Sequence, residues 1–337
     1  MLALIAHPSP GWIEHAYVNG AYARWEPIAY AITSRFPWSL GDLAVLCGVA
    51  VIVWRIAVLL PQRRRVRPSM LRRIAITLLD IAVVVAVYCV WFELAWGWNY
   101  DRAPVETRLH YDAALVTDRT IIALRDRAIN ELNALAPVAH AHSNVPLDIA
   151  ALRAAWLPVV QRAGDTWMPQ SGAPKPTLAD PYMNATGTSG FINPLTLNVQ
   201  LASDLLWFER PFDLAHEWSH TAAYAREDEA NYLAAVTCLH SRDPVIRYSG
   251  WLEVFLALPQ PHSYARSTFI PRVWSDFAAL RARNARRVNL TLANWSWRTY
   301  NVYLKSNRIS AGVVSYDEFT RLIVGIPLDP EGLPETR

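Results

Sequence analysis

Residues 211–220 read Pro-Phe-Asp-Leu-Ala-His-Glu-Trp-Ser-His, and this stretch sets the expectation for the rest of the chain. His216 and His220 are four residues apart, so on an α-helix both imidazoles project from one face. Pro211 suits the first turn of such a helix. Two neutral imidazoles on one face can bind a single Zn²⁺, and Glu217 lies beside them to accept a proton from an attacking water.

A tetrahedral catalytic zinc site needs a third protein ligand and one open position. The sequence predicts a second helix from Glu227 to Leu239, on which Glu227, Ala230 and Asn231 share a face. We expect Glu227 to be the third ligand, with Glu229 as the alternative. Ala230 is small enough to let the two helices approach. Asn231 is expected to hydrogen-bond the far nitrogen of a ligand histidine. The competing interpretation is a surface helix with two solvated histidines.

The composition indicates a membrane protein. Hydrophobic residues make up 53% and charged residues only 18% of the 337 residues, which is more apolar than a typical soluble protein. The length allows one large or two ordinary domains. Three cysteines form no disulfide framework and no CxxC metal pattern, and Cys238 is expected to be a small buried residue. No long basic segment is interleaved with aromatics, so no nucleic-acid partner is expected.

Two apolar runs, residues 43–60 and 74–92, have the length of membrane-spanning helices. Residues 61–73 between them hold six arginines and no acid, which places this loop in the cytoplasm and against anionic lipid. Each run contains one charged residue, Arg55 or Asp80. These lie at nearly equal depth, so we expect them to pair.

The remaining organisation follows from this topology. Residues 1–6 are too short to span a bilayer and do not form a convincing signal peptide. Residues 12–35 are mixed and aromatic, as in an amphipathic segment at a membrane interface. We therefore expect an extracytoplasmic interfacial segment at 1–36, a transmembrane hairpin at 37–96, and an extracytoplasmic domain at 97–337.

The last domain is predicted to be mostly helical. Helices are expected near 115–135, 149–162, 246–258, 269–283, 295–304 and 316–324, and Pro137 is expected to stop the first of them. Residues 170–187 are predicted to be a loop. Residues 189–200 are the strongest strand candidate, and Pro194 favours an edge position. Such an edge can hold an extended peptide, and a purely structural hairpin is the alternative.

Other polar residues carry weaker signals. Arg247 or Tyr248 near a zinc site can stabilise an oxyanion, although packing and salt-bridge roles are commoner for both residue types. Five further histidines have no convincing metal spacing and are interpreted as non-catalytic: His110, His140, His142, His240 and His262.

The pattern of His216, Glu217 and His220 followed by Glu227 resembles that of the gluzincins, which include thermolysin-like enzymes and membrane-bound prenyl-protein and stress-response proteases. Their third ligand is a Glu followed by x-x-small-Asp. The resemblance implies a zincin-like fold and zinc-dependent peptide hydrolysis. Asn231 stands here at the Asp position, and the interval from His220 to Glu227 is short for the group.

A wider set of motifs is similar to an uncharacterised bacterial membrane family known only as a domain of unknown function. These motifs lie between about residues 12 and 324, and besides the histidine motif they are Pro37–Asp42, Trp96–Arg102, Arg226–Asn231, Tyr248–Gly250, Tyr303–Asn307 and Ser315–Tyr316. Members usually show a Gln and a Gly soon after the second histidine, where this chain has Thr221–Ala223. They also tend to begin with a further apolar helix. Residues 1–6 are interpreted as its remnant, with a native start either at Met1 or upstream of it.

The sequence thus predicts a predominantly α fold: a two-helix transmembrane hairpin and a mostly helical, zincin-like (α+β) metallopeptidase domain with a small edge-strand element. The expected ligands of Zn²⁺ are His216, His220 and Glu227, and Glu217 is the general base. The expected protein is a multi-pass enzyme of the bacterial cytoplasmic membrane that hydrolyses peptides. The alternatives are a catalytically silent sensor or scaffold with a structural zinc, and a zinc amidase acting on cell-wall peptides.

Overall fold

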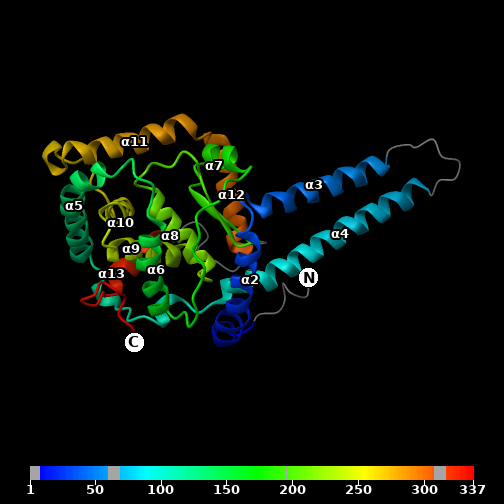
Figure 1. Cartoon of the computed structure of the whole chain (residues 1–337), viewed down its shortest axis with the longest axis horizontal. Coiled ribbons are helices and arrows are strands. Elements are labelled where there is room, and N and C mark those ends of the chain that lie inside the picture. The colour runs from blue at the N-terminus through cyan, green and yellow to red at the C-terminus, as the bar shows by residue number, and fades with distance from the viewer. Residues whose placement is uncertain (1–7, 60–68, 195, 307–315) are drawn as a thin grey trace.

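The computed structural model describes residues 8–59, 69–194, 196–306 and 316–337, and it shows a helical body from which a two-helix hairpin projects (Figure 1). The chain is mostly helical, with two apolar helices and one small two-stranded sheet. The predicted remnant at 1–6, residues 61–68 of the basic loop, and the motif residues Asn307 and Ser315 lie outside the described residues.

The described elements follow in chain order. The helices are α1 (Pro10–Trp12), the π-helix η1 (Ile13–Tyr22), α2 (Ala23–Thr33), α3 (Leu40–Leu59), α4 (Met70–Ala95), the 3₁₀ turns η2 (Gly97–Asp101), η3 (Val105–Thr107) and η4 (Ala113–Leu115), α5 (Asp118–Ala141), α6 (Ile149–Arg162), α7 (Asp180–Thr186), α8 (Arg210–Thr221), α9 (Glu227–His240), α10 (Pro244–Ala257), η5 (Arg266–Thr268), α11 (Pro271–Arg287), α12 (Leu290–Ser306) and α13 (Tyr316–Gly325). The strands are β1 (Gly190–Asn193) and β2 (Asn198–Leu201).

The projecting hairpin consists of α3 and α4, which overlap the two predicted spans and are long and apolar enough to cross a membrane. Only 6% of the most apolar window of each helix is buried by protein, so neither is a core helix of the body. Arg55 Nη2 lies 2.5 Å from Asp80 Oδ2, which confirms the predicted pair. Pairing lowers the cost of placing each charge among apolar residues.

The N-terminal segment packs into the body, which revises the expectation of a separate interfacial segment. Ile13, Tyr17, Val18 and Tyr22 are at most 2% exposed and belong to the main core. They recur every four to five residues, the period that a π-helix places on one face. The Tyr22 hydroxyl donates to the Thr221 carbonyl at 3.0 Å. The aromatic residues of this segment therefore form core contacts with the body.

Within the body, α8 and α9 pack side by side, with α10, α6 and α13 around them and α5 outside α10 (Figure 1). The helix at 149–162 has the predicted bounds, and the four predicted helices after residue 243 all form. The prediction that Pro137 stops a helix is wrong, because α5 continues to Ala141. Leu132, Ala136 and Ala139 on either side of the proline are fully buried, and their packing outweighs the cost of about 3 kcal/mol for an interior proline.

The region before α8 also differs from the prediction. The loop expected at 170–187 contains the short helix α7, which begins at Asp180 with Pro181 in its first turn and ends at Gly187, whose φ is 75°. The strand candidate at 189–200 forms the hairpin that was the alternative: its two strands are antiparallel, with Gly190 paired to Leu201 and Asn193 to Asn198. Pro194 follows β1 at the turn, where a missing N–H costs no sheet hydrogen bond.

Candidate metal centre

Two packed helices bring the predicted ligands together. His216 and His220 lie one turn apart on α8, and Glu227 is the first residue of α9. His216 Nε2 is 3.0 Å from His220 Nε2 and 3.3 Å from Glu227 Oε2, and His220 Nε2 is 3.7 Å from Glu227 Oε1. All the donor atoms lie within 4.8 Å of one another.

These separations fit one zinc ion. Zinc–nitrogen and zinc–oxygen bonds of about 2.0–2.1 Å at a tetrahedral angle separate neighbouring ligand atoms by about 3.3 Å. The three observed separations fall within about 0.4 Å of that value. Among the described residues, three side chains with metal-ligating atoms come together here: His216, His220 and Glu227. A zinc ion held by these three side chains would keep a fourth position for water or substrate.

The turn after α8 fixes the second histidine. Ala223 has φ of 70°, its N–H bonds the His220 carbonyl, and the Tyr224 N–H bonds the Ser219 carbonyl. This pattern is a Schellman motif, in which the residue with positive φ is usually glycine. The turn brings the Tyr224 carbonyl to 2.7 Å from His220 Nδ1. A carbonyl partner there leaves Nε2 unprotonated and directed at the cluster.

The expected role of Asn231 is therefore wrong: the partner of the far nitrogen of His220 is a backbone carbonyl, and Nδ1 of His216 is buried without a hydrogen-bond partner. The turn follows α8 so closely that Tyr224 reaches the imidazole before α9 begins. Glu229, the alternative ligand, lies elsewhere. Its Oε1 accepts from the Val105 N–H at 3.0 Å and is 3.6 Å from Arg226 Nε.

A buried ion network supports this turn. Arg102, with 2% of its side chain exposed, lies 2.7 Å from Asp165 and 2.9 Å from Glu14. Its third contact is a hydrogen bond of 3.1 Å to the Ala222 carbonyl. The guanidinium also lies over the Tyr224 ring, 4.2 Å from its centre. Arg102 thus connects the N-terminal segment to the turn that holds His220.

Burial and neighbouring charges shift the acid–base properties of the cluster. Burial lowers the pKa of His220 to about 4. Burial alone would also lower the pKa of His216, but the hydrogen bond and charge of Glu227 raise it to about 9. Burial raises the pKa of Glu217 to about 8. His216 Nε2 and Glu227 Oε2 lie 3.3 Å apart, where one cation would bind both groups.

A cavity of about 670 Å³ opens beside the cluster. His216, Glu217, His220 and Glu227 line it, together with residues 187–192 around β1 and side chains from α7, α12 and the end of α4. A Cβ on Gly190 would lie 2.7 Å from Glu217 Oε1, so only glycine lets β1 approach this carboxylate. Oε2 of Glu217 is buried without a hydrogen-bond partner. The carboxylate therefore has an acceptor oxygen available for a water or substrate proton.

The sequence alone did not identify Gly190, Trp96 and Tyr100 as neighbours of the cluster. Trp96 and Tyr100 follow α4 and line the cavity, whereas the sequence places them only in the motif Trp96–Arg102. Gly190 lies near the start of the strand candidate. A glycine within a strand can mark a close approach of another group to the backbone, and this was the signal in the sequence for its contact with Glu217.

The other candidates lie away from the cavity. The Tyr248 hydroxyl contacts Asp276, and its ring stacks on Trp207 with centres 5.7 Å apart. Arg247 pairs with Glu131 at 3.2 Å. Both residues therefore have packing or salt-bridge roles, and the oxyanion role considered for them is wrong. His140 also binds Asp276, at 2.9 Å, which accords with a non-catalytic role.

Comparisons with known proteins give a family and no activity. No curated protein matches the chain, and no solved structure matches it. One family model, described as "Protein of unknown function (DUF3810)", matches residues 17–324. This match covers most of the chain and includes both apolar helices, the strands β1 and β2 and the His–His–Glu cluster. The chain therefore belongs to the DUF3810 family.

Proposed function

We propose that this protein is a membrane-anchored zinc metallopeptidase. The observation that carries the proposal is the approach of two imidazole nitrogens and one carboxylate to within 4.8 Å, at the wall of a cavity that Glu217 also lines. Two histidines and one glutamate with an open position are the ligand set of catalytic zinc in one large class of peptidases. The His–Glu–x–x–His sequence supports the same chemistry.

Each residue of the site would have a separate role in peptide hydrolysis. His216, His220 and Glu227 would hold the zinc, which when bound supplies a Lewis acid that polarises the peptide carbonyl and lowers the pKa of a water. Glu217 would accept the proton of the attacking water and deliver it to the leaving amine. Oε2 of Glu217 has no hydrogen-bond partner among the described residues and would be available to accept that proton.

The same proposal states which membrane holds the protein and on which side of that membrane the body lies. The hairpin of α3 and α4 would anchor the protein in the cytoplasmic membrane of a bacterium, in contact with the lipid bilayer. The arginine-rich loop between the two helices would lie in the cytoplasm, so the body would be extracytoplasmic.

The two alternatives make different predictions at the same cluster. A structural zinc in a silent scaffold requires a fourth protein ligand. Within the described residues the cluster has three members and borders a cavity, which favours catalysis. A zinc amidase acting on cell-wall peptides would use the same groups on a different amide. The test therefore includes both a peptide library and a cell-wall peptide fraction.

The test is Glu217→Gln in zinc-loaded protein reconstituted in lipid nanodiscs, assayed on a quenched peptide library and on a cell-wall peptide fraction. We expect zinc content to stay the same and the rate to fall by about 10²–10⁴, the usual contribution of a positioned general base. Glu331→Gln, an exposed carboxylate far along the chain, is the control and should leave the rate unchanged. Full activity of Glu217→Gln would refute the assigned role.

A further inference from the structure

We infer that the substrate is a polypeptide anchored in the same bilayer, and that it is cut in the segment that leaves the membrane beside α3 and α4. This inference rests on the proposed function and adds the substrate class. It comes from the position of the cavity relative to the two apolar helices, which three independent parts of the structure define.

The first part is the beginning of α3. Its 20 residues span about 30 Å, which equals the hydrocarbon thickness, so the whole helix is needed to cross. Its first turn already contacts the body: the Asp42 carboxylate accepts from the Leu178 N–H at 2.8 Å and from the Thr177 hydroxyl at 3.0 Å. The residue before α3, Ser39, lies 3.0 Å from the side-chain amide of Gln200 in β2. No stalk separates the hairpin β1–β2 from the membrane end of α3.

The second part is the end of α4. This helix stops at Ala95, and the next residue, Trp96, lines the cavity together with Tyr100. The Trp96 ring centre is 6.4 Å from that of His220. The candidate metal ligands thus lie one side chain away from the end of a membrane helix. A substrate leaving the bilayer in extended form covers about 3.3 Å per residue, so about eight residues span roughly 26 Å, enough to pass from the end of α4 to the cluster.

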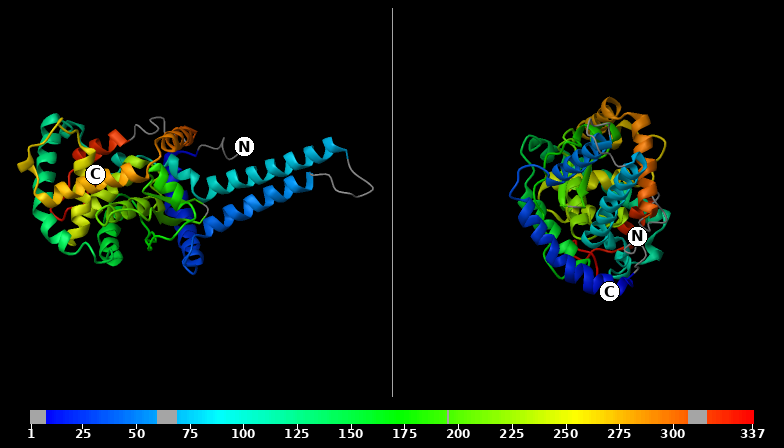
Figure 2. Two further views of the ribbon diagram at one scale, coloured as in Figure 1. Left: turned by 90° about the horizontal axis from the view of Figure 1, so that it is seen from above. Right: turned by 90° about the vertical axis from the view of Figure 1, so that its right-hand side faces the viewer.

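The third part is α12, which packs on α7 through a 2.8 Å hydrogen bond between Ser296 and the Tyr182 hydroxyl. It lies at the end of the body that bears α3 and α4 (Figure 1 and the left panel of Figure 2). Leu290 and Trp295 are 74% and 60% exposed there, while Trp297 lines the cavity. Tryptophan favours the membrane–water interface. An apolar rim at this end suits contact with lipid and with an apolar juxtamembrane segment.

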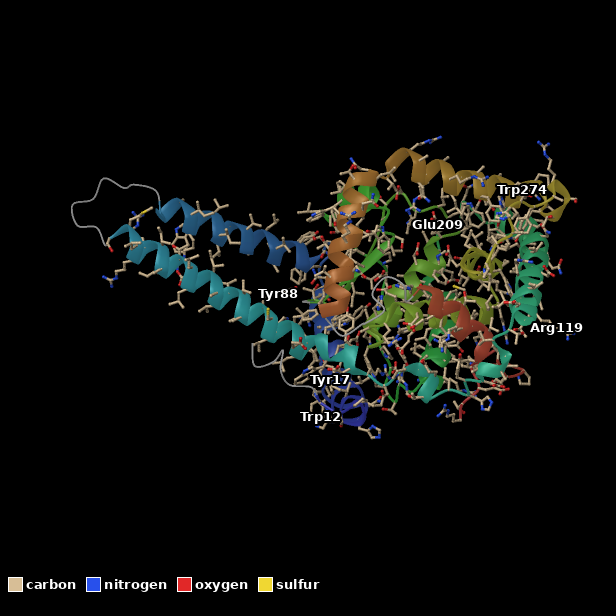
Figure 3. All side chains as sticks on the ribbon, turned by 180° about the vertical axis from the view of Figure 1, so that it is seen from behind. Trp12, Tyr17, Tyr88, Arg119, Glu209 and Trp274 are labelled. Atoms are coloured by element: carbon tan, nitrogen blue, oxygen red, sulfur yellow. The ribbon has the colours of Figure 1, made fainter. Side chains whose placement is uncertain are left out.

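Aromatic residues also lie where α4 enters the body. Figure 3 shows Trp12 and Tyr17 there, whereas Arg119 and Trp274 lie at the opposite end. The Trp12 ring packs edge-on against Trp98, at 5.7 Å between centres, just after the end of α4. Trp12 is 45% exposed, so this end of the body, which also bears the cavity, presents tryptophan where the chain would leave the membrane.

The experiment compares three forms of one quenched peptide library: a soluble form, a palmitoylated form with a short flexible spacer, and a palmitoylated form with a rigid spacer of about twelve prolines, which is roughly 37 Å long. The protein is zinc-loaded and reconstituted with the probes in liposomes. Both lipidated forms reach the same surface concentration, so their comparison isolates the height of the scissile segment above the bilayer.

We expect the short-spacer probe to be cut at least about tenfold faster than the rigid-spacer probe, with cleavage within about eight residues of the lipid. Equal rates, a faster rigid-spacer probe, or cleavage of the soluble form alone would overturn the inference and leave the peptidase intact. No cleavage of any form by zinc-loaded protein would instead overturn the proposed function.

A pair of matched variants tests whether α12 contacts the membrane. Trp295→Ser removes an exposed aromatic at the hairpin end, and Ile122→Ser removes an exposed apolar residue from α5 at the opposite end. We expect Trp295→Ser to slow the short-spacer probe about threefold or more without changing the soluble probe, because interfacial tryptophan holds the rim at the membrane. Ile122→Ser should change neither rate. The same result for both variants would remove α12 from the inferred contact.

Discussion

Replacing Arg102 with methionine tests the connection between the N-terminal segment and the candidate metal centre. Methionine keeps most of the apolar volume of the side chain and removes its charge. The change removes hydrogen bonds to Glu14 at 2.9 and 3.0 Å, to Asp165 at 2.7 Å and to the Ala222 carbonyl at 3.1 Å. Asp165 would stay fully buried without its main counter-charge.

The expected loss of stability depends on the contacts that Glu14 and Asp165 keep in the variant. Breaking a buried ion pair by removing one partner costs about 3–5 kcal/mol. Arg108 still contacts Glu14 at 3.0 Å, and the Tyr224 hydroxyl still donates to Asp165 at 3.3 Å, which favours the lower end, about 3 kcal/mol. For a body of this size each kcal/mol lowers Tm by about 2–4 °C, so we expect a loss of about 6–12 °C.

The assay is thermal unfolding of the detergent-purified protein, followed by tryptophan fluorescence. Arg247→Met is the matched control, because its pair with Glu131 is half-exposed and is expected to contribute at most about 1 kcal/mol. Adding Asp165→Asn to Arg102→Met should recover part of the loss, since no buried charge is then left unpaired. If Arg102→Met unfolds at the same temperature as Arg247→Met, the network does not stabilise the fold as argued.

Two further predictions concern buried charges elsewhere. Burial raises the pKa of Glu26 to about 8 from 4.5, so the folded state holds its proton more tightly and loses stability as pH rises from about 4.5 to 8, by up to about 1.4 kcal/mol per pH unit. Glu26→Gln should therefore gain in Tm over wild type as pH increases through that window, and a difference independent of pH would contradict the assignment. Asp80→Ala should lower the amount of protein in membranes, because it leaves Arg55 unpaired, and Arg55→Leu with Asp80→Leu should restore it. An unchanged membrane fraction on immunoblots of Asp80→Ala would count against the pair.

The parts of the fold that the sequence predicted well carry strong local signals. The long apolar runs predicted α3 and α4, and the 3.6-residue spacing of apolar residues predicted α6 and the helices after residue 243. The placement of His216, His220 and Glu227 was predictable because one helical turn fixes the first two. Acidic residues at 227–229 suit the positive end of the next helix.

The differences have tertiary or local causes. The aromatic residues of 12–35 suit an interface and a protein core equally well, and only the structure shows Tyr17 and Tyr22 buried against the body. The Pro137 prediction failed because packing overrode a local preference. The partner of His220 could not be predicted from spacing, since it depends on Ala223 adopting a positive φ in place of the glycine that usually ends such a helix.

The most direct test of the central claim is the zinc content of the purified, zinc-equilibrated protein, measured by mass spectrometry beside His216→Ala, Glu227→Ala and the control His142→Ala. His142 is exposed and its ring contacts only the nearby Val138 carbonyl among the described hydrogen bonds. The account predicts about one zinc per chain in wild type and His142→Ala, and its loss in the other two variants. Wild-type protein that takes up no zinc, or Glu227→Ala that keeps it, would contradict the ligand set and the function built on it.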